Sequence, residues 1–431
     1  QLARPYPRLS GAGGAARRAT DAETGMTDSA TGEARMNDPG AQAAFDARRD
    51  GRRALTLDTA QAFLARARLG AMTESGFAER WALFWANVFT VSATKFQSGV
   101  FMGQYEREAI RPHVFGRFED LAVAANGHPA MLLYLDQVRS TGPNSPAGRR
   151  REAGLNENLA REALELHTVG ADGGYTQADV SEFARALTGW SVPAARDQGV
   201  ARGRRDRAGG PGANGFVFRA SLHEPGDRTV MGRRHGEGGV AQGEAILRDL
   251  ANRPQTARRL TRRIAAHFVA DQPPPALTAR LEEAWTGSGG DLAAVARALI
   301  AAPEAWAPRP AKVKTPYEFI ISTHRALGTA PERIEPVRQA LLRMGQPMFA
   351  APSPEGWPDT ADDWAGPDAL VKRLNWARTV AERSAAGDPD AVAASALGPR
   401  LGDRARQMIA RAESRSEAMT LFLMSPEFQR R

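Results

Sequence analysis

The sequence predicts an all-α fold, a globular multi-helix protein with one glycine-rich insertion that has room for a short β-hairpin. Apolar residues recur at helical spacing over three stretches, 51–190, 244–345 and 369–431. Little of the chain alternates between apolar and polar residues, as a half-buried strand would. The chain has 431 residues, of which 42% are hydrophobic, and this is enough to bury a sizeable core.

Residues 1–50 are the first predicted segment. They are rich in small and charged residues and carry few large apolar side chains. Such a segment buries too little surface to offset its ordering entropy, so we predict that it is disordered. It holds no apolar core of a secretory signal. The compartment stays open: periplasmic or exported if a segment precedes Gln1, otherwise cytoplasmic.

The first helical part, 51–190, carries an aromatic stripe. Its members recur at three- to four-residue spacing, which predicts a buried helix face rather than a ligand platform: Trp81, Phe84, Trp85, Val88 and Phe89. The sequence Asn126-Gly127-His128-Pro129 predicts the end of one helix and the start of the next, with proline early in the new helix.

Residues 191–243 form the glycine-rich insertion. Twelve glycines fall between Gly199 and Gly243, and only Phe216-Val217-Phe218 favours a short strand. A loop this long inside a domain is usually functional or disordered, so we interpret it as a flap.

The second helical part, 244–345, follows. A Pro- and Trp-rich segment, 346–368, is predicted to be ordered, extended and pinned by its tryptophans, before the C-terminal helices of 369–431.

Composition excludes several classes of protein. The net charge is +8, but only four of the 57 basic residues are lysines, and the arginines are interleaved with 49 acidic residues. This pattern argues against a nucleic-acid partner, which a basic stripe would indicate. The absence of cysteine excludes disulfides, thiolate metal sites and cysteine nucleophiles. No apolar run reaches the roughly 20 residues that a membrane-spanning helix needs, so we predict no transmembrane segment.

Several motifs occur together along the chain. The longest is GLNENLAREALELHTVG at 154–170, which continues as DGGYT at 172–176. The others are FWANVF at 84–89, REAIRPH at 107–113, HPAML at 128–132, ALTGW at 186–190, KTPYEF at 314–319 and PEGWP at 354–358. On these motifs, which span residues 75–380 and beyond, the chain resembles the bacterial domain-of-unknown-function family number 1800.

The resemblance implies a bacterial protein whose family has no assigned reaction. Members are often encoded beside a second uncharacterised family, number 1501, whose members look exported and sulfatase-like. A family 1501 protein is therefore the candidate partner that the resemblance implies.

The longest motif carries two candidate catalytic residues, Glu162 and Glu165. If residues advance by 100° along a helix that starts near Leu155, Glu162 falls inside the apolar arc, and Asn158 and Glu165 flank it. A carboxylate that is half-buried beside another has a raised pKa unless a cation compensates it. A general acid, or one half of a metal site, requires such a group.

A structural interpretation of the same residues competes with the catalytic one. Arg161 lies four residues before Glu165, which is the spacing of a salt-bridge ladder. Glu162 could pair with Arg185 on the next helix or cap a backbone amide. The helical wheel points His167 away from Glu162. We expect His167 at the helix end, where a histidine meets the terminal carbonyls favourably.

Four residues are candidates for ligand binding: Asn158, His167, Trp190 and Trp357. The asparagine and the histidine accompany the glutamates on one predicted helix. The two tryptophans could stack on a sugar or another ligand ring, although such residues more often pin loops. His267 and His324, on apolar helix faces, are predicted to be core residues.

Three residues of the insertion, His223, Asp227 and His235, are candidate metal ligands, because imidazole and carboxylate are suitable donors. No helix fixes their spacing, so an ordinary polar loop is the alternative. Residues 168–179 have the spacing of a calcium loop but lack carboxylates at its first two ligand positions, which favours a Gly-Gly turn with Thr176 as helix N-cap. No sequence motif identifies a cofactor.

Two functions follow from these patterns. The first is a binding or assembly protein that acts with a family 1501 partner. The alternative is a hydrolase or lyase of a glycan-like polymer, with Glu162 and Glu165 as its carboxylate pair. Whether the protein is an enzyme stays open at this stage.

Overall fold

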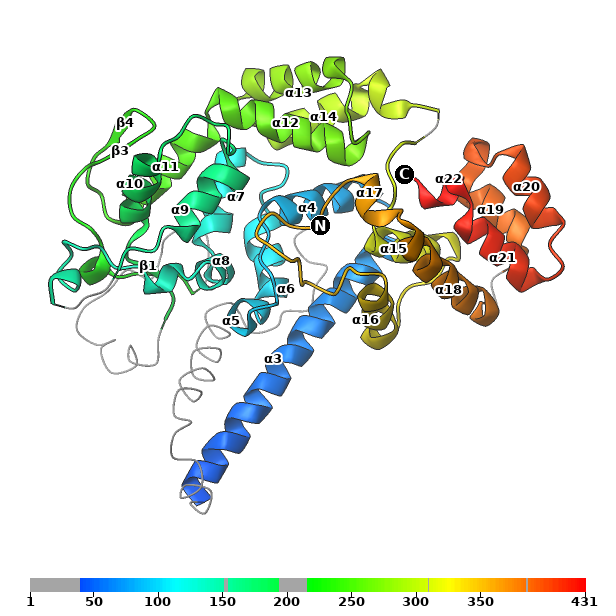
Figure 1. Cartoon of the computed structure of the whole chain (residues 1–431), viewed down its shortest axis with the longest axis horizontal. Coiled ribbons are helices and arrows are strands. Elements are labelled where there is room, and N and C mark those ends of the chain that lie inside the picture. The colour runs from blue at the N-terminus through cyan, green and yellow to red at the C-terminus, as the bar shows by residue number, and fades with distance from the viewer. Residues whose placement is uncertain (1–38, 151–153, 194–214, 309, 385–386) are drawn as a thin grey trace.

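The computed structural model describes residues 39–150, 154–193, 215–308, 310–384 and 387–431. Within these ranges the predicted all-α class is confirmed, because helices dominate and the strands form two small two-stranded sheets. No described helix is long and apolar enough to cross a membrane. Figure 1 shows the long helix α3 standing off from the other helices at its N-terminal half.

The first helical part runs from α3 to α10. Its α-helices are α3 (Pro39–Met72), α4 (Gly76–Val88), α5 (Phe96–Gly99), α6 (Met102–Tyr105), α7 (Phe118–Gly127), α8 (Pro129–Tyr134), α9 (Asn158–Glu162) and α10 (Gln177–Leu187). Two π-helical turns, η1 (Glu106–Ile110) and η4 (Ala163–His167), continue α6 and α9. Helix α3 begins inside the segment for which we predicted disorder, and residues 1–38 of that segment lie outside the described ranges.

The remaining α-helices are α11 (Val240–Ala251), α12 (Pro254–Phe268), α13 (Pro275–Ser288), α14 (Leu292–Ala301), α15 (Pro316–Ala326), α16 (Ile334–Arg343), α17 (Ala361–Trp364), α18 (Pro367–Arg383), α19 (Pro389–Leu397), α20 (Asp403–Ala410), α21 (Arg415–Met424) and α22 (Pro426–Gln429). Helices α12 to α14 pack on one another, and α18 to α22 form a further group around α21 (Figure 1).

The insertion holds the strands. Strand β1 (Trp190–Ser191) pairs antiparallel with β2 (Val217–Phe218), at the place where the sequence favoured a strand. Strands β3 (Arg228–Val230) and β4 (Arg233–His235) form a hairpin. Its two turn residues, Met231 and Gly232, both have positive φ, which suits the twist of a tight hairpin. Residues 194–214 of the predicted flap lie outside the described part.

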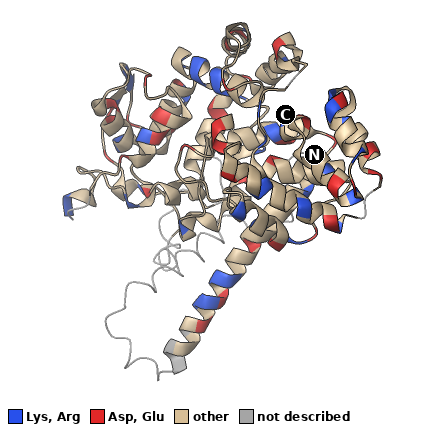
Figure 2. Cartoon of the chain, turned by 45° about the vertical axis from the view of Figure 1, so that its right-hand side comes forward, with Lys and Arg blue, Asp and Glu red and all other residues tan. Residues whose placement is uncertain are grey.

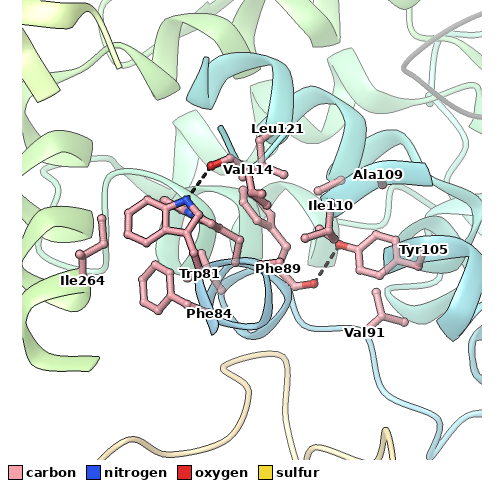
Figure 3. Close-up of a cluster of buried hydrophobic side chains, with 14 of the residues drawn as sticks. Trp81, Phe84, Phe89, Val91, Tyr105, Ala109, Ile110, Val114, Leu121 and Ile264 are labelled. Atoms are coloured by element: carbon pink, nitrogen blue, oxygen red, sulfur yellow. Dashed lines mark hydrogen bonds between the residues drawn. The ribbon is translucent and has the colours of Figure 1, made fainter. Parts of the chain in front are cut away.

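The aromatic stripe of α4 lies in the core, as predicted (Figure 3). Trp81 is fully buried, and its indole Nε1 donates to the carbonyl of Val114 at 2.6 Å. Tyr105 is buried as well, and its hydroxyl donates to the Phe89 carbonyl at 2.8 Å. These bonds satisfy the polar atoms of two large side chains, so the end of α4 and the turn before α7 are fixed to one core.

The Pro- and Trp-rich segment crosses the end of α4. The Asn87 side chain clamps it, because Nδ2 donates to the Trp357 carbonyl at 2.9 Å and Oδ1 accepts from the Trp357 amide at 2.8 Å. Earlier in the segment, Ser92 Oγ donates to the Ala351 carbonyl at 2.8 Å. Backbone anchors supplied by α4 and the loop after it therefore hold the segment, in addition to its tryptophans.

Gly356 makes this clamp sterically possible. Its φ is +95°, and a Cβ at this position would lie 2.6 Å from Asn87 Oδ1 and 2.7 Å from Thr90 Oγ1. Gly356→Ala should lower the free energy of unfolding by at least about 2 kcal/mol, because it adds strain at positive φ to overpacking. Urea unfolding followed by tryptophan fluorescence measures this change.

The matched control is Gly287→Ala, in α13, where a Cβ would meet nothing within 4 Å. This change should leave stability unaltered or raise it by up to about 1 kcal/mol. Equal effects of the two substitutions would show that the clamp does not require a glycine.

Candidate functional site

A cavity of about 260 Å³, partly open to the surface, lies beside α4. It is larger than the roughly 150 Å³ that suffices to hold a benzene-sized molecule. Helices α3, α4 and α15 and the segment 346–359 supply most of its wall, and apolar side chains predominate there. The apolar and small lining residues include Phe63, Leu83, Ala86, Met102, Ile321, Leu341, Phe349 and Trp357.

A neutral network of buried charges lies in and directly behind the cavity wall. The Arg111 guanidinium donates to both carboxylate oxygens of Glu79, at 2.7 and 2.8 Å, and its side chain is only 1% exposed. Glu106 pairs with Arg66 at 2.7 Å and lies 3.5 Å from Arg111. Two carboxylates and two guanidiniums therefore balance within the wall, as burial of charge requires.

A second group of charges also lines the cavity. His267, on α12, lies with its Nδ1 2.7 Å from Asp359 Oδ1, and both residues line the cavity. Burial alone would raise the pKa of the Asp359 carboxyl, but His267, Arg431 and Lys312 hold it at about 2. Burial lowers the pKa of His267 and outweighs the attraction of Asp359. Near neutral pH the pair is therefore a carboxylate beside a neutral imidazole.

Arg80 is the under-bonded cation of this group. Its Nε lies 3.6 Å from Glu318, and neither Nε nor Nη2 makes a hydrogen bond in the described part of the chain. Glu318 accepts instead from Arg431 Nε at 2.8 Å. Burial lowers the pKa of Arg80 to about 10, so the guanidinium stays charged at neutral pH. A charged donor in a cavity wall that has two buried, unbonded nitrogens and only a loosely paired carboxylate favours an anionic ligand group.

Lys314 adds an amine to the same wall. Its Nζ lies 3.8 Å from the centroid of the Phe428 ring. Burial, opposed by Glu318 and supported by nearby arginines, lowers the pKa of Lys314 to about 7. A substantial fraction of this amine is therefore neutral under ordinary conditions.

The two predicted catalytic glutamates lie outside the lining of this cavity. Glu165 accepts a 2.5 Å hydrogen bond from the Tyr175 hydroxyl and lies 3.6 Å from Arg161, as the salt-bridge alternative predicted. Glu162 makes no hydrogen bond or ion pair with any described residue. Burial, and then the charges of Glu165 and Glu355, raise its pKa against the effect of Arg161. The acid role of Glu162 stays a prediction.

The expectation that Glu162 could pair with Arg185 was wrong. Arg185 bonds to Glu182, three residues before it on α10. The π-helical turn η4 begins at Ala163, directly after Glu162, so a wheel of 100° per residue places the later residues incorrectly.

His167 is the last residue of η4, so it lies at the helix end as predicted, but its imidazole turns into the core. It is fully buried, its Nδ1 lies 2.9 Å from Asn126 Oδ1, and its ring packs against Phe89. Burial, with the charges of Arg259 and Arg263, lowers the pKa of His167 to about 3. The imidazole is therefore a neutral core group and does not face the helix-terminal carbonyls.

The other predicted binding residues are dispersed. Asn158 is exposed on α9, while Trp190 is 1% exposed and packs edge-on against Phe216. Trp357 alone of these candidates lines the cavity, next to the Asn87 clamp.

The three candidate metal ligands do not come together. His223 Nδ1 lies 2.9 Å from the Thr188 carbonyl, Asp227 bonds to Arg234, and His235 lies in the hairpin opposite Arg228. Among the described residues, no group of three or more His, Asp or Glu side chains could hold a metal ion. Their metal role is therefore a prediction without supporting geometry.

The predicted N-cap of α10 is confirmed. Thr176 and Asp179 form a capping box, in which each side chain bonds to the other residue's backbone amide.

Sequence reasoning missed His267, which was assigned to the core. Its partner Asp359 directly follows the PEGWP motif, so a carboxylate beside a distinctive loop was the available signal. The two residues are 92 positions apart, and only the folded segment brings them together.

The chain matches a family model described as "Protein of unknown function (DUF1800)" over residues 8–430. The protein belongs to this family. The resemblance carried by the sequence motifs is thereby confirmed. No curated protein and no solved structure matches the chain.

The buried charge network of this DUF1800 protein gives a stability prediction. Arg111→Met should lower the free energy of unfolding by roughly 3–5 kcal/mol, because Glu79 loses both of its hydrogen bonds from Arg111 while it remains buried. Arg117→Met is the control, since that arginine is 48% exposed in its pair with Glu119 and should cost less than about 1 kcal/mol. Chemical denaturation measures the loss of unfolding free energy in each variant, and equal losses would contradict a special role for the buried pair.

His167 gives a pH prediction. Its pKa of about 3 in the folded protein lies below the usual 6.5, so the unfolded chain binds the proton more readily. Its contribution to stability is complete above about pH 6.5 and is lost as the pH falls toward 3. His167→Gln should flatten this part of the curve of unfolding free energy against pH. An unchanged slope in the variant would assign the acid sensitivity to other groups.

Proposed function

We propose that this DUF1800 protein is a binding protein whose cavity beside α4 holds a mainly apolar ligand with one anionic or strongly hydrogen-bond-accepting group. The observation that carries the proposal is the Arg80 guanidinium in the wall of an apolar cavity, with two nitrogens that make no hydrogen bond. An apolar pocket with a few convergent polar groups is the usual form of a small-molecule site.

The uneven sharing of Glu318 supports the same ligand class. Glu318 accepts from Arg431 Nε at 2.8 Å but lies 3.6 Å from Arg80 Nε. Arg80 is therefore the less well bonded of the two guanidiniums, and a guanidinium in this position favours an acceptor or an anion from a ligand.

The distribution of charged residues along the described chain bears on a nucleic-acid partner. Figure 2 shows basic and acidic residues interleaved along α3 and over the other helices in view. This distribution supports the expectation that nucleic acid is not the partner. The family 1501 partner rests on the family resemblance alone, and co-purification of the two proteins tests it.

The glycan hydrolase or lyase is the second candidate function. The raised pKa of Glu162 favours it, because a general acid needs a carboxyl that stays protonated to higher pH. The position of Glu162 outside the lining of the cavity favours the binding function instead.

Calorimetric titration with octanoate, octanol and octylamine tests the proposed function, since these probes share one chain and differ in the head group. Octanoate should bind at least about tenfold more tightly than octanol, which corresponds to about 1.4 kcal/mol. Octylamine should bind most weakly, because Arg80 repels it. Arg80→Gln should abolish the preference for octanoate.

Two further variants complete this test. Ala86→Trp, which fills the cavity from α4, should weaken binding of all three probes. Arg280→Gln, on α13, removes an arginine that is 49% exposed and should change nothing. No binding of any probe to the unaltered protein would overturn the proposed function, and equal affinities for the three would overturn the anionic requirement.

A further inference from the structure

We propose that His267 is a general base that activates water against a carboxylic ester bound in this cavity, with Asp359 as the residue that positions it. The inference rests on the proposed binding function and adds a reaction to it. Its observations are the His267–Asp359 pair, the free nitrogen of His267, and Arg80 on the neighbouring helix.

The hydrogen bond to Asp359 fixes the proton on the histidine. Asp359 is ionised, since the pKa of its carboxyl is held at about 2, so it accepts a proton-bearing Nδ1 at 2.7 Å. In the neutral imidazole the lone pair is then on Nε2. That nitrogen makes no hydrogen bond with a described residue and is not sealed from solvent, whereas four other histidines have a sealed, unbonded Nε2: His128, His167, His223 and His235. The acceptor nitrogen of His267 is therefore open to a water in the cavity.

Other groups around His267 determine its proton affinity. Asp359 and Glu318 favour the protonated form, and Arg431 disfavours it. Arg431 also donates to the backbone carbonyl of His267 at 2.8 Å, which fixes the position of that residue on α12. Burial remains the largest influence, so the imidazole is neutral and able to accept a proton.

Arg80 is placed to stabilise the charge that the reaction creates. Its guanidinium lies 5.1 Å from the centroid of the Phe268 ring, and the neighbouring His267 ring lies 4.8 Å from the same ring. Phe84, one turn after Arg80 on α4, contacts the His267 ring at 5.1 Å. The cation and the base therefore both border the Phe268 ring, and Arg80 is the cation that would donate to a developing oxyanion.

The reaction balances without a further reagent. His267 Nε2 takes a proton from water as the water oxygen bonds to the ester carbonyl carbon, and the carbonyl oxygen becomes an oxyanion beside Arg80. The carbon–oxygen bond to the leaving group then breaks, and the imidazolium returns the proton to the leaving alkoxide. The products are a carboxylic acid and an alcohol. The acid product belongs to the ligand class already proposed for the cavity, and an apolar acyl chain suits its walls.

Hydrolysis of p-nitrophenyl octanoate by the purified full chain tests the inference. The protein should release p-nitrophenolate without an initial burst, because no acyl-enzyme forms, and octanoate should inhibit competitively. His267→Gln should lower kcat/KM by at least about 100-fold. Asp359→Asn should lower kcat more than it raises KM and should shift the pH profile, because the imidazole loses its fixed tautomer. Arg280→Gln, the surface control, should match the unaltered protein.

The unaltered protein gives a test that no folding defect can confuse. Turnover should be slower in D₂O, since a proton moves in the limiting step, and treatment with a serine-directed sulfonyl fluoride should leave the activity intact. No hydrolysis above buffer, or full activity of a folded His267→Gln variant, would overturn the base. If octanoate binds but the ester survives, the binding function stands and the base falls. If the ester is cleaved through His267 but octanoate does not bind, the general base stands and the proposed binding function falls.

Discussion

The pairing of one side-chain amide with one backbone unit organises the site. Asn87 occupies both the N–H and the C=O of Trp357, so the segment after α16 can run across α4 at one register only. That register places Asp359 against His267 and Trp357 in the cavity wall. An asparagine is suited to this because its amide offers a donor and an acceptor side by side. The buried Lys312 supports the same placement, since it bonds to the Asp359 carbonyl and to Asp271.

The charged groups in and behind the cavity wall fall into two sets that are bonded differently. In the first set Arg111 is bonded to both carboxylate oxygens of Glu79, and both side chains are almost unexposed. Such a buried, paired network holds helices in place. In the second set, Arg80 Nε and Nη2 are buried and make no hydrogen bond, although its side chain as a whole is 35% exposed. The first set therefore holds the wall in place, and Arg80 is the group of the second set that favours an acceptor from a ligand.

The sequence revealed the helical class because spacing alone specifies which faces are buried, and Trp81 with its neighbours lies in the core as expected. It also revealed Thr176 as an N-cap, since the capping box is a local pattern. The site was not accessible in the same way. His267 becomes a site residue only through Asp359, and nothing within a window of one helix indicates that pairing. The motifs around Asn87 and Trp357 indicated a resemblance, but which of them meet depends on tertiary structure.

The π-helical turns explain a second kind of failure. A π-helical turn adds a residue to one turn, so every side chain after it rotates relative to an α-helical wheel. In α9 and η4, His167 lies at the helix end as expected, but its side chain is buried in the core, where it meets Asn126 and Phe89. Nothing in the sequence around Ala163 distinguishes a π-helical turn from an α-helical one. The extra residue of this π-helical turn therefore limits how far periodicity can assign the buried face of the helix after Glu162.

Two carboxyl groups show how environment, and not residue type, divides the possible roles. Glu162 is half-buried without a bonded cation, and the nearby charges of Glu165 and Glu355 add to the burial that raises its pKa. Asp359 is also largely buried, but His267, Arg431 and Lys312 reverse the effect and hold its pKa at about 2. One short segment takes part in both cases. Its residue Glu355 contributes to the raised pKa of Glu162, and its residue Asp359 is the carboxylate that stays ionised. A base that must keep one tautomer needs the second kind of carboxylate, and for this reason the chemistry follows Asp359 and His267 rather than the glutamate pair.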